Sequence, residues 1–518
     1  MSRSPANPSR PTPPIALQAA PAEVAERLGG PRVPVDDRLL RRLREVCDEV
    51  TLDDADRAEA GRDWWPLGIG WATEGAVPAR PAVVARPGSV AEVCEVLAAC
   101  HEARVPVTPT AGRSGVCGAG VPVFGGVALD LNGLHGIESV DDRSLRAAVR
   151  PGTFGPDLER DLAGRRLTLG HWPQSMALST VGGWIACRGA GQYSTRYGKV
   201  EDMVVGLEVA LADGRTVRTG CAGPRAAVGP DLTQLFVGSE GVLGVVTNAV
   251  LRLHPAPPDE ARRAYGFADF ETGLEACRRV LRRGATPAVL RLYDAVESQR
   301  NFDVPGRALL VVLDEADPLL LAATMEVVDD ECRQSGGEQM DAELVERWMQ
   351  HRNDVSALAP LYGGGIVVDT MEVAGPWAVL PSLYRRCVEA LQAVAGTLAA
   401  SAHQSHAYPD GACLYFTFAG RRPDDEDAGA APAGFGAGSW AERYYVACWD
   451  AVMAVVEADG ASISHHHGIG LNRARFMRGA LGEGFAVLTS LKQALDPRGI
   501  LNPGKLGLPS PFGEVPWP

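Results

Sequence analysis

A glycine-rich turn at residues 109–115 reads Pro-Thr-Ala-Gly-Arg-Ser-Gly and follows a predicted strand at 105–109. Consecutive small residues expose backbone N–H groups, and such a concave turn can hold a pyrophosphate. The turn is not the GxGxxG fingerprint of a dinucleotide fold, because no helix is predicted after it. It is not a P-loop either, because no Gly-Lys-Ser/Thr follows. Taken alone, the pattern also fits a tight turn between two strands.

Two more glycine-rich segments lie further along the chain. Residues 173–189 read Pro-Gln-Ser-Met-Ala-Leu-Ser-Thr-Val-Gly-Gly-Trp-Ile-Ala-Cys-Arg-Gly, and residues 237–244 read Val-Gly-Ser-Glu-Gly-Val-Leu-Gly. The pair Gly182 and Gly183 either lets a flat ring pass close to the backbone or begins a helix. Glu240 is suited to cap or position a neighbour. Three such segments in one region predict a large, planar cofactor that carries phosphate.

A run of three histidines occupies residues 464–468, which read Ser-His-His-His-Gly. Neighbouring side chains on a strand point to opposite faces, so we expect His465 and His467 on one face and His466 on the other. Metal ligands must converge on one point, which a bare triple histidine does not provide. The sequence therefore predicts no metal site. It predicts a polar cluster lining a pocket, because imidazoles on an apolar run need partners.

Length, charge and cysteine content argue against several classes of protein. The 518 residues are enough for two to four domains, and the formal net charge of −14 argues against non-specific nucleic-acid binding. Eleven scattered cysteines without a Cys-x-x-Cys pair indicate reduced thiols rather than a disulfide scaffold or structural zinc. No run approaches the roughly 18–20 apolar residues that span a bilayer, and the N-terminus lacks the apolar core of a secretory signal. We expect a cytoplasmic protein.

Helices and strands are predicted in mixed order, which is typical of an α+β fold. Ser89 and Asp317 are predicted N-caps, and Pro318 suits a first helical position. Prolines 255, 257 and 258 predict a domain boundary. Residues 421–439 are predicted to form a mobile loop. The predicted helices cover residues 35–49, 90–103, 271–283, 318–335, 377–395 and 441–457, and the predicted strands include 81–87, 105–109, 127–131, 204–211, 242–253, 308–313, 365–369 and 413–418.

These segments resemble the flavoenzymes whose FAD domain is of the vanillyl-alcohol-oxidase or p-cresol-methylhydroxylase (PCMH) type. Two motifs, Tyr-Gly-Lys-Val-Glu-Asp at 197–202 and Gly-Ala-Cys-Leu-Tyr-Phe at 411–416, resemble the alkyldihydroxyacetonephosphate synthase (alkylglycerone-phosphate synthase) subfamily, which makes the ether bond of ether lipids. The triple histidine fits this subfamily too, whereas related dehydrogenases usually carry Glu-His-Gly where residues 466–468 read His-His-Gly. The similarity runs from about Pro78 to Leu506.

The resemblance implies a domain order. A disordered or extended segment (1–34) and a helical region (35–76) precede a PCMH-type two-subdomain FAD-binding domain (77–257). A ferredoxin-like α+β substrate (cap) domain (258–460) follows, and a helical C-terminal segment (461–518) returns to the flavin site.

The resemblance also implies site residues. Tyr415 is the expected acid/base residue, His465, His466 and His467 lie near the flavin, Arg291 acts at the reacting centre, and Arg352 binds substrate. For each arginine the alternative is a surface ion pair, and for Tyr415 it is a packed strand aromatic. The implied FAD contacts are Pro109, Thr110, Ala111, Gly112, Arg113, Ser114, Gly115, Pro173, Gln174, Ser175, Met176, Ala177, Leu178, Ser179, Ala186, Cys187, Arg188, Gly189, Gly238, Ser239, Glu240, Gly241, Val242, Leu243 and Gly244.

The implied reaction exchanges the acyl group of an acyl-dihydroxyacetone phosphate for a long-chain alcohol through a flavin N5 adduct. Arg113 departs from the family's usual Gly-Gly-Gly-Thr-Ser loop. Residues 403–410 depart from the family pattern too, and metal binding by His403 and His406 with a third ligand, as in some related dehydrogenases, is the alternative to the expected absence of a metal. Cys117 stands where covalently flavinylated relatives often carry histidine, so we expect non-covalent, dissociable FAD, with a cysteine linkage as the alternative.

The departures leave alternative functions. One is an FAD-dependent oxidoreductase of a 2-hydroxy acid, an alcohol or a phenol, and another is an FAD-binding scaffold without chemistry. The expected partner is a small-molecule or lipid substrate and not a nucleic acid. Peripheral membrane contact and a homodimer stay open.

Overall fold

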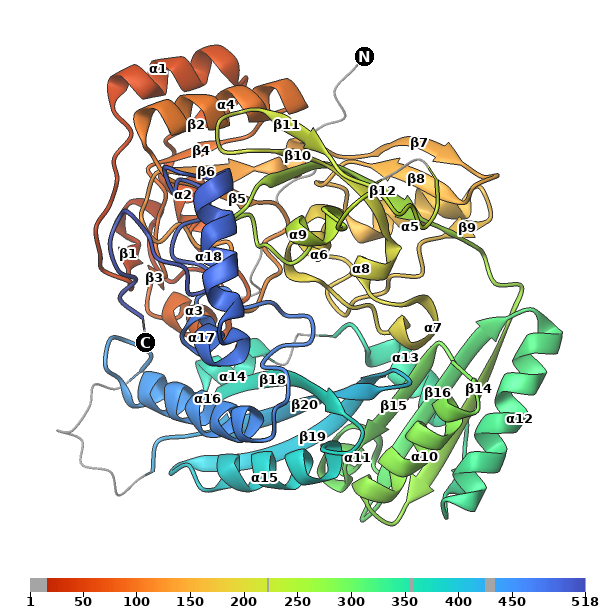
Figure 1. The fold of residues 1–518 in the computed structure, drawn as a ribbon. Coiled ribbons are helices and arrows are strands. Elements are labelled where there is room, and N and C mark those ends of the chain that lie inside the picture. The colour runs from red at the N-terminus through yellow and green to blue at the C-terminus, as the bar shows by residue number, and fades with distance from the viewer. Residues whose placement is uncertain (1–15, 221–222, 355–357, 424–433, 518) are drawn as a thin grey trace.

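The computed structural model describes residues 16–220, 223–354, 358–423 and 434–517. The fold is α+β and has an N-terminal half with two sheets, a cap with one large sheet, and a C-terminal segment that returns to the N-terminal half (Figure 1). Residues 1–15 of the predicted disordered or extended segment (1–34) lie outside the described residues, as do residues 424–433 of the predicted mobile loop.

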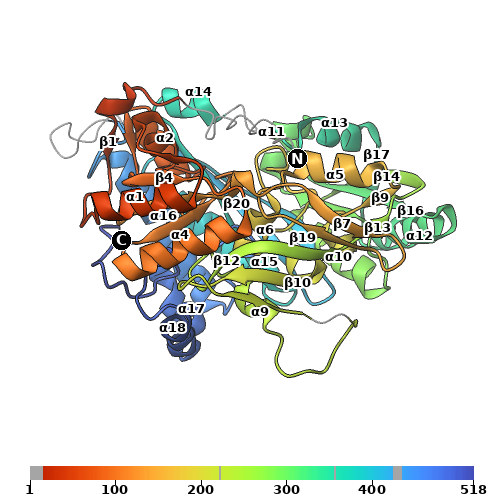
Figure 2. The same cartoon turned by 90° about the horizontal axis from the view of Figure 1, so that it is seen from above.

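The N-terminal half begins with short elements that pack around its first sheet. Asp36 caps α1, because its side chain accepts a hydrogen bond from the N–H of Leu39. In both views α1 lies alongside α4 (Figure 1, Figure 2). The elements are a 3₁₀ turn (Pro21–Glu23), β1 (Ala25–Glu26), α1 (Asp37–Val46), α2 (Asp54–Glu59), α3 (Pro66–Ala72) and β3 (Ala76–Val77).

The first sheet has four strands in the order β2-β4-β6-β5, of which β4, β6 and β5 run parallel. These three strands are almost wholly buried, and the apolar sequence of β4 and of most of β6 suits strands covered on both faces, whereas β5 carries two threonines. Helix α4 (Val90–Ala103) has the predicted bounds, and the predicted Ser89 N-cap is confirmed because its hydroxyl accepts from the N–H of Glu92. The strands are β2 (Val50–Thr51), β4 (Val83–Ala85), β5 (Val107–Thr110) and β6 (Val127–Asp130).

The second sheet is antiparallel, with five strands in the order β11-β10-β12-β8-β7. Burial alternates along β12, so one face of this strand packs into the core. The strands are β7 (Ile137–Asp141), β8 (Arg146–Val149), β10 (Val204–Ala210), β11 (Thr216–Arg218) and β12 (Val245–Arg252), and β9 (Leu167–Thr168) pairs with β13 (His254–Pro255). Associated helices are a 3₁₀ turn (Leu131–Gly133), α5 (Gly155–Ala163), α6 (Val181–Cys187), α7 (Ser194–Tyr197), α8 (Val200–Met203) and α9 (Thr233–Phe236).

The cap is built on a seven-stranded antiparallel sheet in the order β17-β14-β16-β15-β19-β20-β18. Helices α10, α12 and α15 cover the face that points away from the N-terminal half (Figure 1). The strands are β14 (Asp259–Phe267), β15 (Val289–Tyr293), β16 (Ala308–Ala316), β17 (Glu338–Met340), β18 (Val367–Pro376), β19 (Thr397–Ala407) and β20 (Gly411–Gly420).

The cap helices follow most of the predictions. Asp317 caps α12 by accepting from the N–H of Leu319, and Pro318 is its first residue, as predicted. The helix predicted at 377–395 begins later, at Leu380, because β18 continues to Pro376. The helices are α10 (Phe270–Arg282), α11 (Ala295–Phe302), α12 (Pro318–Gln334), α13 (Glu343–His351), α14 (Leu358–Gly363), α15 (Leu380–Gln392) and α16 (Trp440–Ala458).

The C-terminal segment is joined to the N-terminal half by buried polar side chains. Lys492 Nζ donates to the carbonyls of Val242 and Leu501, both at 2.8 Å. Asn502 Nδ2 donates to the carbonyl of Glu240 at 2.7 Å, and Lys505 Nζ to that of Val121 at 2.7 Å. The helices here are a 3₁₀ turn (Ala474–Phe476), α17 (Met477–Leu481) and α18 (Gly484–Leu495).

Two features of the described residues bear on the expectations about disulfides and membrane-spanning segments. In this part of the chain the cysteines are free thiols. Among the same residues, no helix combines the length and the apolar character needed to cross a bilayer.

Candidate functional site

A cavity of about 530 Å³ opens where the N-terminal half meets the cap. The three glycine-rich segments supply much of its wall, and Arg291, His406, Tyr415, His466 and His467 come from the cap and the C-terminal segment. Residues more than 350 positions apart in the sequence therefore line one space.

Glycines bring the three segments into contact. A Cβ at Gly112 would lie 2.2 Å from the carbonyl oxygen of Leu178, so only glycine lets the first and second segments approach this closely. Gly241 has a φ of +76°, and a Cβ there would lie 2.4 Å from Pro109, so the third segment lies against the first. The glycine pattern builds the cavity wall as well as exposing its backbone.

Several buried polar atoms at the cavity have no partner within the described chain. They are Thr110 Oγ1, Arg113 Nε and Asp63 Oδ2. Burial raises the pKa of the Asp63 carboxyl to about 7. Buried polar groups without partners are costly, so the wall is suited to a ligand that carries many polar atoms. A long cavity with a small-residue turn, an unpaired guanidinium nitrogen and mostly apolar surroundings fits FAD.

Most of the predicted FAD contacts line the cavity. All of residues 109–115 do so, together with Pro173, Gln174, Ser175, Ala177, Leu178, Ser179, Ala186, Cys187, Gly189, Ser239, Glu240, Gly241 and Gly244. Five predicted contacts do not line the cavity: Met176, Arg188, Gly238, Val242 and Leu243. Val242 and Leu243 are buried in the core, and Arg188 packs against Gly238.

Glu240 ties the cavity wall to the C-terminal segment. Its carboxylate accepts hydrogen bonds from the N–H groups of Ile469 at 2.6 Å and Gly470 at 2.9 and 3.1 Å. Burial raises the pKa of this carboxyl to about 6. Its carboxylate therefore positions the loop that follows the triple histidine.

Tyr415 lies at the centre of the polar wall contributed by the cap. Its hydroxyl on β20 lies 2.6 Å from Nε2 of His466 and 3.0 Å from Nε2 of His467. Its ring stacks on that of His403, with centroids 4.9 Å apart and planes 10° apart. Burial raises the pKa of Tyr415 well above its usual value, so the phenol is neutral in the resting protein.

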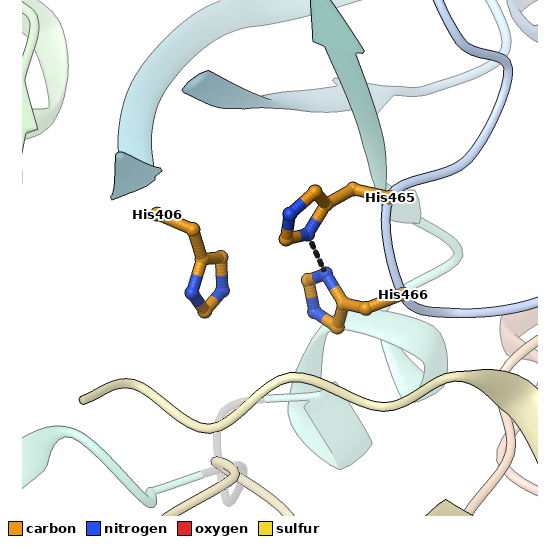
Figure 3. Close-up of side chains that lie close together, drawn as sticks. All are labelled: His406, His465 and His466. Atoms are coloured by element: carbon orange, nitrogen blue, oxygen red, sulfur yellow. Dashed lines mark hydrogen bonds between the residues drawn. The ribbon is translucent and has the colours of Figure 1, made fainter. Parts of the chain in front are cut away.

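The triple histidine does not form a strand, and the expectation that His466 faces away from its neighbours was wrong. Residues 465–467 form a bent loop, and His466 and His467 both reach Tyr415. The cause is a tertiary contact: Glu372 on β18 accepts from the backbone N–H groups of His465 and His467. His465 lies behind, with its Nδ1 2.9 Å from Nδ1 of His466 (Figure 3).

His406 from β19 joins His465 and His466 in a cluster that could hold a metal ion. One ring nitrogen from each lies within 4.8 Å of the others, and the three rings face one another (Figure 3). Burial lowers the pKa of all three imidazoles, so each keeps a lone pair. The alternative metal pair considered from the sequence was His403 and His406 with a third ligand, whereas the structure groups His406 with His465 and His466. That this protein uses no metal stays a prediction.

The two predicted arginines occupy different positions. Arg291 on β15 lines the cavity, and its Nη2 donates to Nε2 of His403 at 2.6 Å. Arg352 lies beside the wall, and its neighbour Asn353 lines it. The Arg352 guanidinium lies over the rings of Tyr193 and Trp348, with its carbon 5.1 and 5.5 Å from their centroids.

Sequence reasoning missed three carboxylates at this site: Asp63, Glu297 and Glu372. Glu297 is buried, and its carboxylate lies 2.7 Å from Nδ1 of His403, so it orients the imidazole that holds Arg291. Glu372 could have been found from the sequence, because it is an acidic residue within the largely apolar strand β18, and a buried carboxylate requires a partner. No comparable pattern identified Asp63.

The N-terminal half contains two sheets and a cavity suited to a phosphate-bearing ligand. The antiparallel cap closes this cavity and brings a phenol, imidazoles and a guanidinium to it. This arrangement is that of an FAD-dependent flavoenzyme. Residues 81–220 match the model described as "FAD binding domain" and residues 256–506 the model described as "FAD linked oxidases, C-terminal domain". The chain belongs to the FAD-linked oxidase family. These matches confirm the predicted FAD cofactor and the predicted PCMH-type fold class.

Relatives with different names match most of the chain. The uncharacterized FAD-linked oxidoreductase YgcU of Escherichia coli O157:H7 is 30% identical over 445 residues, which cover 82% of this chain and 89% of YgcU. Alkyldihydroxyacetonephosphate synthase of Dictyostelium discoideum is 26% identical over 471 residues, covering 83% and 74%. A solved structure of an alkyldihydroxyacetonephosphate synthase superimposes with a TM-score of 0.75 at 22% identity, covering 94% and 88%.

Proposed function

We propose that the protein is an alkylglycerone-phosphate synthase-like transferase, which replaces the acyl group of an acyl-dihydroxyacetone phosphate by a long-chain alcohol in ether lipid synthesis. The observation that carries the proposal is Tyr415, whose hydroxyl at the cavity wall contacts two imidazoles. The similarity to the Dictyostelium synthase supports the proposal.

Such a reaction needs a base, because a C–H bond beside a ketone must lose its proton. A free tyrosine has a pKa of about 10, so its hydroxyl acts as a base only if a neighbour takes its proton first. His466 and His467 are neutral, since burial lowers the pKa of both rings, and each has a nitrogen within hydrogen-bond distance of the hydroxyl. One of the two imidazoles is therefore suited to accept and return that proton.

The substrate also carries negative charge. A phosphate monoester and a developing enolate both require cations, and a guanidinium binds either through a pair of N–H groups. We assign the enolate to Arg291, which lines the cavity, and the phosphate to Arg352, which lies beside the cavity wall. Bound FAD would supply a ring that accepts electron density at the same place.

The alternative function is an FAD-dependent oxidoreductase acting on a 2-hydroxy acid, an alcohol or a phenol. YgcU, which bears that class of name, supports it. For this function Tyr415 would take a hydroxyl proton of the substrate, and bound FAD would supply the electron acceptor.

Two assays separate these functions. Purified protein with palmitoyl-dihydroxyacetone phosphate and hexadecanol should yield the ether product, measured by mass spectrometry. An oxidoreductase should instead show bleaching of the yellow flavin under anaerobic conditions when a D-2-hydroxy acid or an alcohol is added. Bleaching without ether formation would reject the transferase.

Replacing Tyr415 by phenylalanine tests the proposed base. We expect Y415F to lose on the order of 10²–10⁴-fold in turnover, because acid/base catalysis is removed, and to keep FAD bound. Tyr444 provides a matched control, since its buried hydroxyl bonds Thr397 far from the cavity. Y444F should retain turnover, and a Y415F enzyme with turnover equal to that of Y444F would remove Tyr415 from the mechanism.

A further inference from the structure

We infer that the buried carboxylate of Glu372 sets the direction of the hydrogen bonds that join Tyr415 to the three histidines, so that the proton of Tyr415 passes to His467 and not to His466. The inference rests on the proposed function for the role of Tyr415 as a base. It makes Glu372 a positioning residue, because this side chain does not line the cavity.

Glu372 is a fixed negative charge behind the histidine loop. Its side chain is fully buried and accepts from Arg473 Nη1 at 2.9 Å, from the Ser464 hydroxyl at 2.8 Å and from the N–H of His467 at 2.8 Å. Burial works to raise the pKa of this carboxyl, but Arg473 and the histidine loop together outweigh it and lower the pKa to about 2. Glu372 is therefore ionised at neutral pH.

This charge determines which nitrogen of His467 carries the proton. Nδ1 of His467 lies 3.7 Å from Oε1 of Glu372, and His467 has no hydrogen-bond partner at Nδ1 among the described residues. A lone pair facing the carboxylate would be repelled, whereas an N–H is attracted, so the proton resides on Nδ1. Nε2 of His467 then has the lone pair and accepts the O–H of Tyr415 at 3.0 Å.

The remaining directions follow from the hydrogens available. The phenol has one hydrogen, which goes to His467, so the contact of 2.6 Å with His466 must be donated by Nε2–H of His466. Nδ1 of His466 then has the lone pair and accepts from Nδ1–H of His465 at 2.9 Å. This leaves a lone pair on Nε2 of His465, an atom that is buried and has no partner in the described part of the chain.

The arrangement has one consequence for the proton step. The O–H bond of Tyr415 breaks and an N–H bond forms at Nε2 of His467, which gives a tyrosinate and an imidazolium. The imidazolium lies against Glu372, and the tyrosinate keeps the hydrogen bond from Nε2–H of His466. The tyrosinate oxygen can then take the substrate's C–H proton. With the opposite direction, the new imidazolium would form on His466, which has no carboxylate partner among its hydrogen bonds.

Histidine ring NMR tests the assignment directly on the FAD-bound full-length protein. With ¹⁵N-labelled histidine, and with single His→Gln variants at 465, 466 and 467 for assignment, we expect the Nδ1–H form for His465 and His467 and the Nε2–H form for His466. An Nε2–H form of His467 would overturn the inference, whatever the reaction of the enzyme proves to be. If this pattern is found but no ether product forms, the proposed function fails and the inference stands.

The variant E372Q tests the consequence. Its amide presents N–H groups where the carboxylate accepted them, so we expect the ring signals of His467 to change to the Nε2–H form and turnover to fall on the order of 10²–10⁴-fold. Asp314 supplies a matched control, because its buried carboxylate also pairs with an arginine, Arg196 at 2.6 Å, but does not line the cavity.

D314N should keep the His467 signals and the turnover of the wild type. An E372Q protein with wild-type turnover and unchanged ring signals would refute the role of Glu372. If E372Q does not fold, the ring forms of the wild type decide.

Discussion

The glycine contacts of the cavity wall predict that a single methyl group will separate two parts of the FAD site. A Cβ at Gly112 would lie 2.2 Å from the carbonyl oxygen of Leu178, whereas ordinary contacts begin at 3.4 Å. The first and second glycine-rich segments must therefore move apart by about 1 Å in G112A. Overpacking of this kind costs about 1–3 kcal/mol.

Gly115 offers the control within the same turn. A Cβ there would meet Asp63 Oδ2 at 3.6 Å, an ordinary contact, and neither glycine has a positive φ, so both alanines are free of backbone strain. We expect G112A, but not G115A, to lower the thermal midpoint of the apoprotein by a few degrees. If the same cost falls on cofactor binding, the dissociation constant for FAD rises about 5- to 150-fold in G112A.

The assays are differential scanning calorimetry of the FAD-free proteins and fluorescence titration with FAD. Calorimetry decides, because a methyl at Gly115 can touch the cofactor itself but leaves the empty protein unstrained. Equal thermal midpoints for G112A and G115A would refute the reasoning that this glycine is required by the packing of the two segments.

Two further predictions concern charges. Replacing Arg352 by lysine should raise the apparent KM for an anionic substrate about tenfold with a smaller change in kcat, because the planar guanidinium and its stacking on two aromatic rings are lost. R347K in α13, the helix that Arg352 follows, is the control. An unchanged KM in R352K would contradict the role of Arg352 in substrate binding. Burial raises the pKa of Asp63 to about 7 from its usual 3.8, so this group's stabilisation is complete below pH 3.8 and is lost as the pH rises to about 7. D63N should therefore gain thermal stability relative to wild-type apoprotein as the pH rises from 4 to 8 in calorimetric scans. A constant difference would contradict a buried carboxyl whose pKa is raised.

The sequence was sufficient to predict those helix starts that depend on residues adjacent in the chain. Ser89 and Asp317 mark helix starts because a side-chain oxygen can bond an N–H two or three residues later, which the sequence displays. The glycine-rich segments were recognisable because close approach requires glycine at fixed positions. The match to the family models confirms the cofactor that they predicted.

Long-range contacts account for what the sequence concealed. The triple histidine was expected as a strand because its alternation could be judged only locally, but Glu372, which lies 93 residues before His465, holds it as a loop. Val242 and Leu243 follow Glu240 in a recognised motif, yet they point into the core, since a motif fixes the chain's path and not each side chain's direction. Asp63 is far from every glycine-rich segment, and only folding brings it to the cavity.

The anchoring of residues 469–505 has a consequence for biosynthesis. Glu240, Asn502 and Lys505 fasten this stretch onto strands and loops that leave the ribosome hundreds of residues earlier. Nascent chains that end before this stretch would have an incomplete FAD site, because the cavity wall beside Glu240 would lack its contacts with residues 469–505. The cavity wall beside Glu240 is therefore complete only once residues 469–505 have been synthesised and have packed against it.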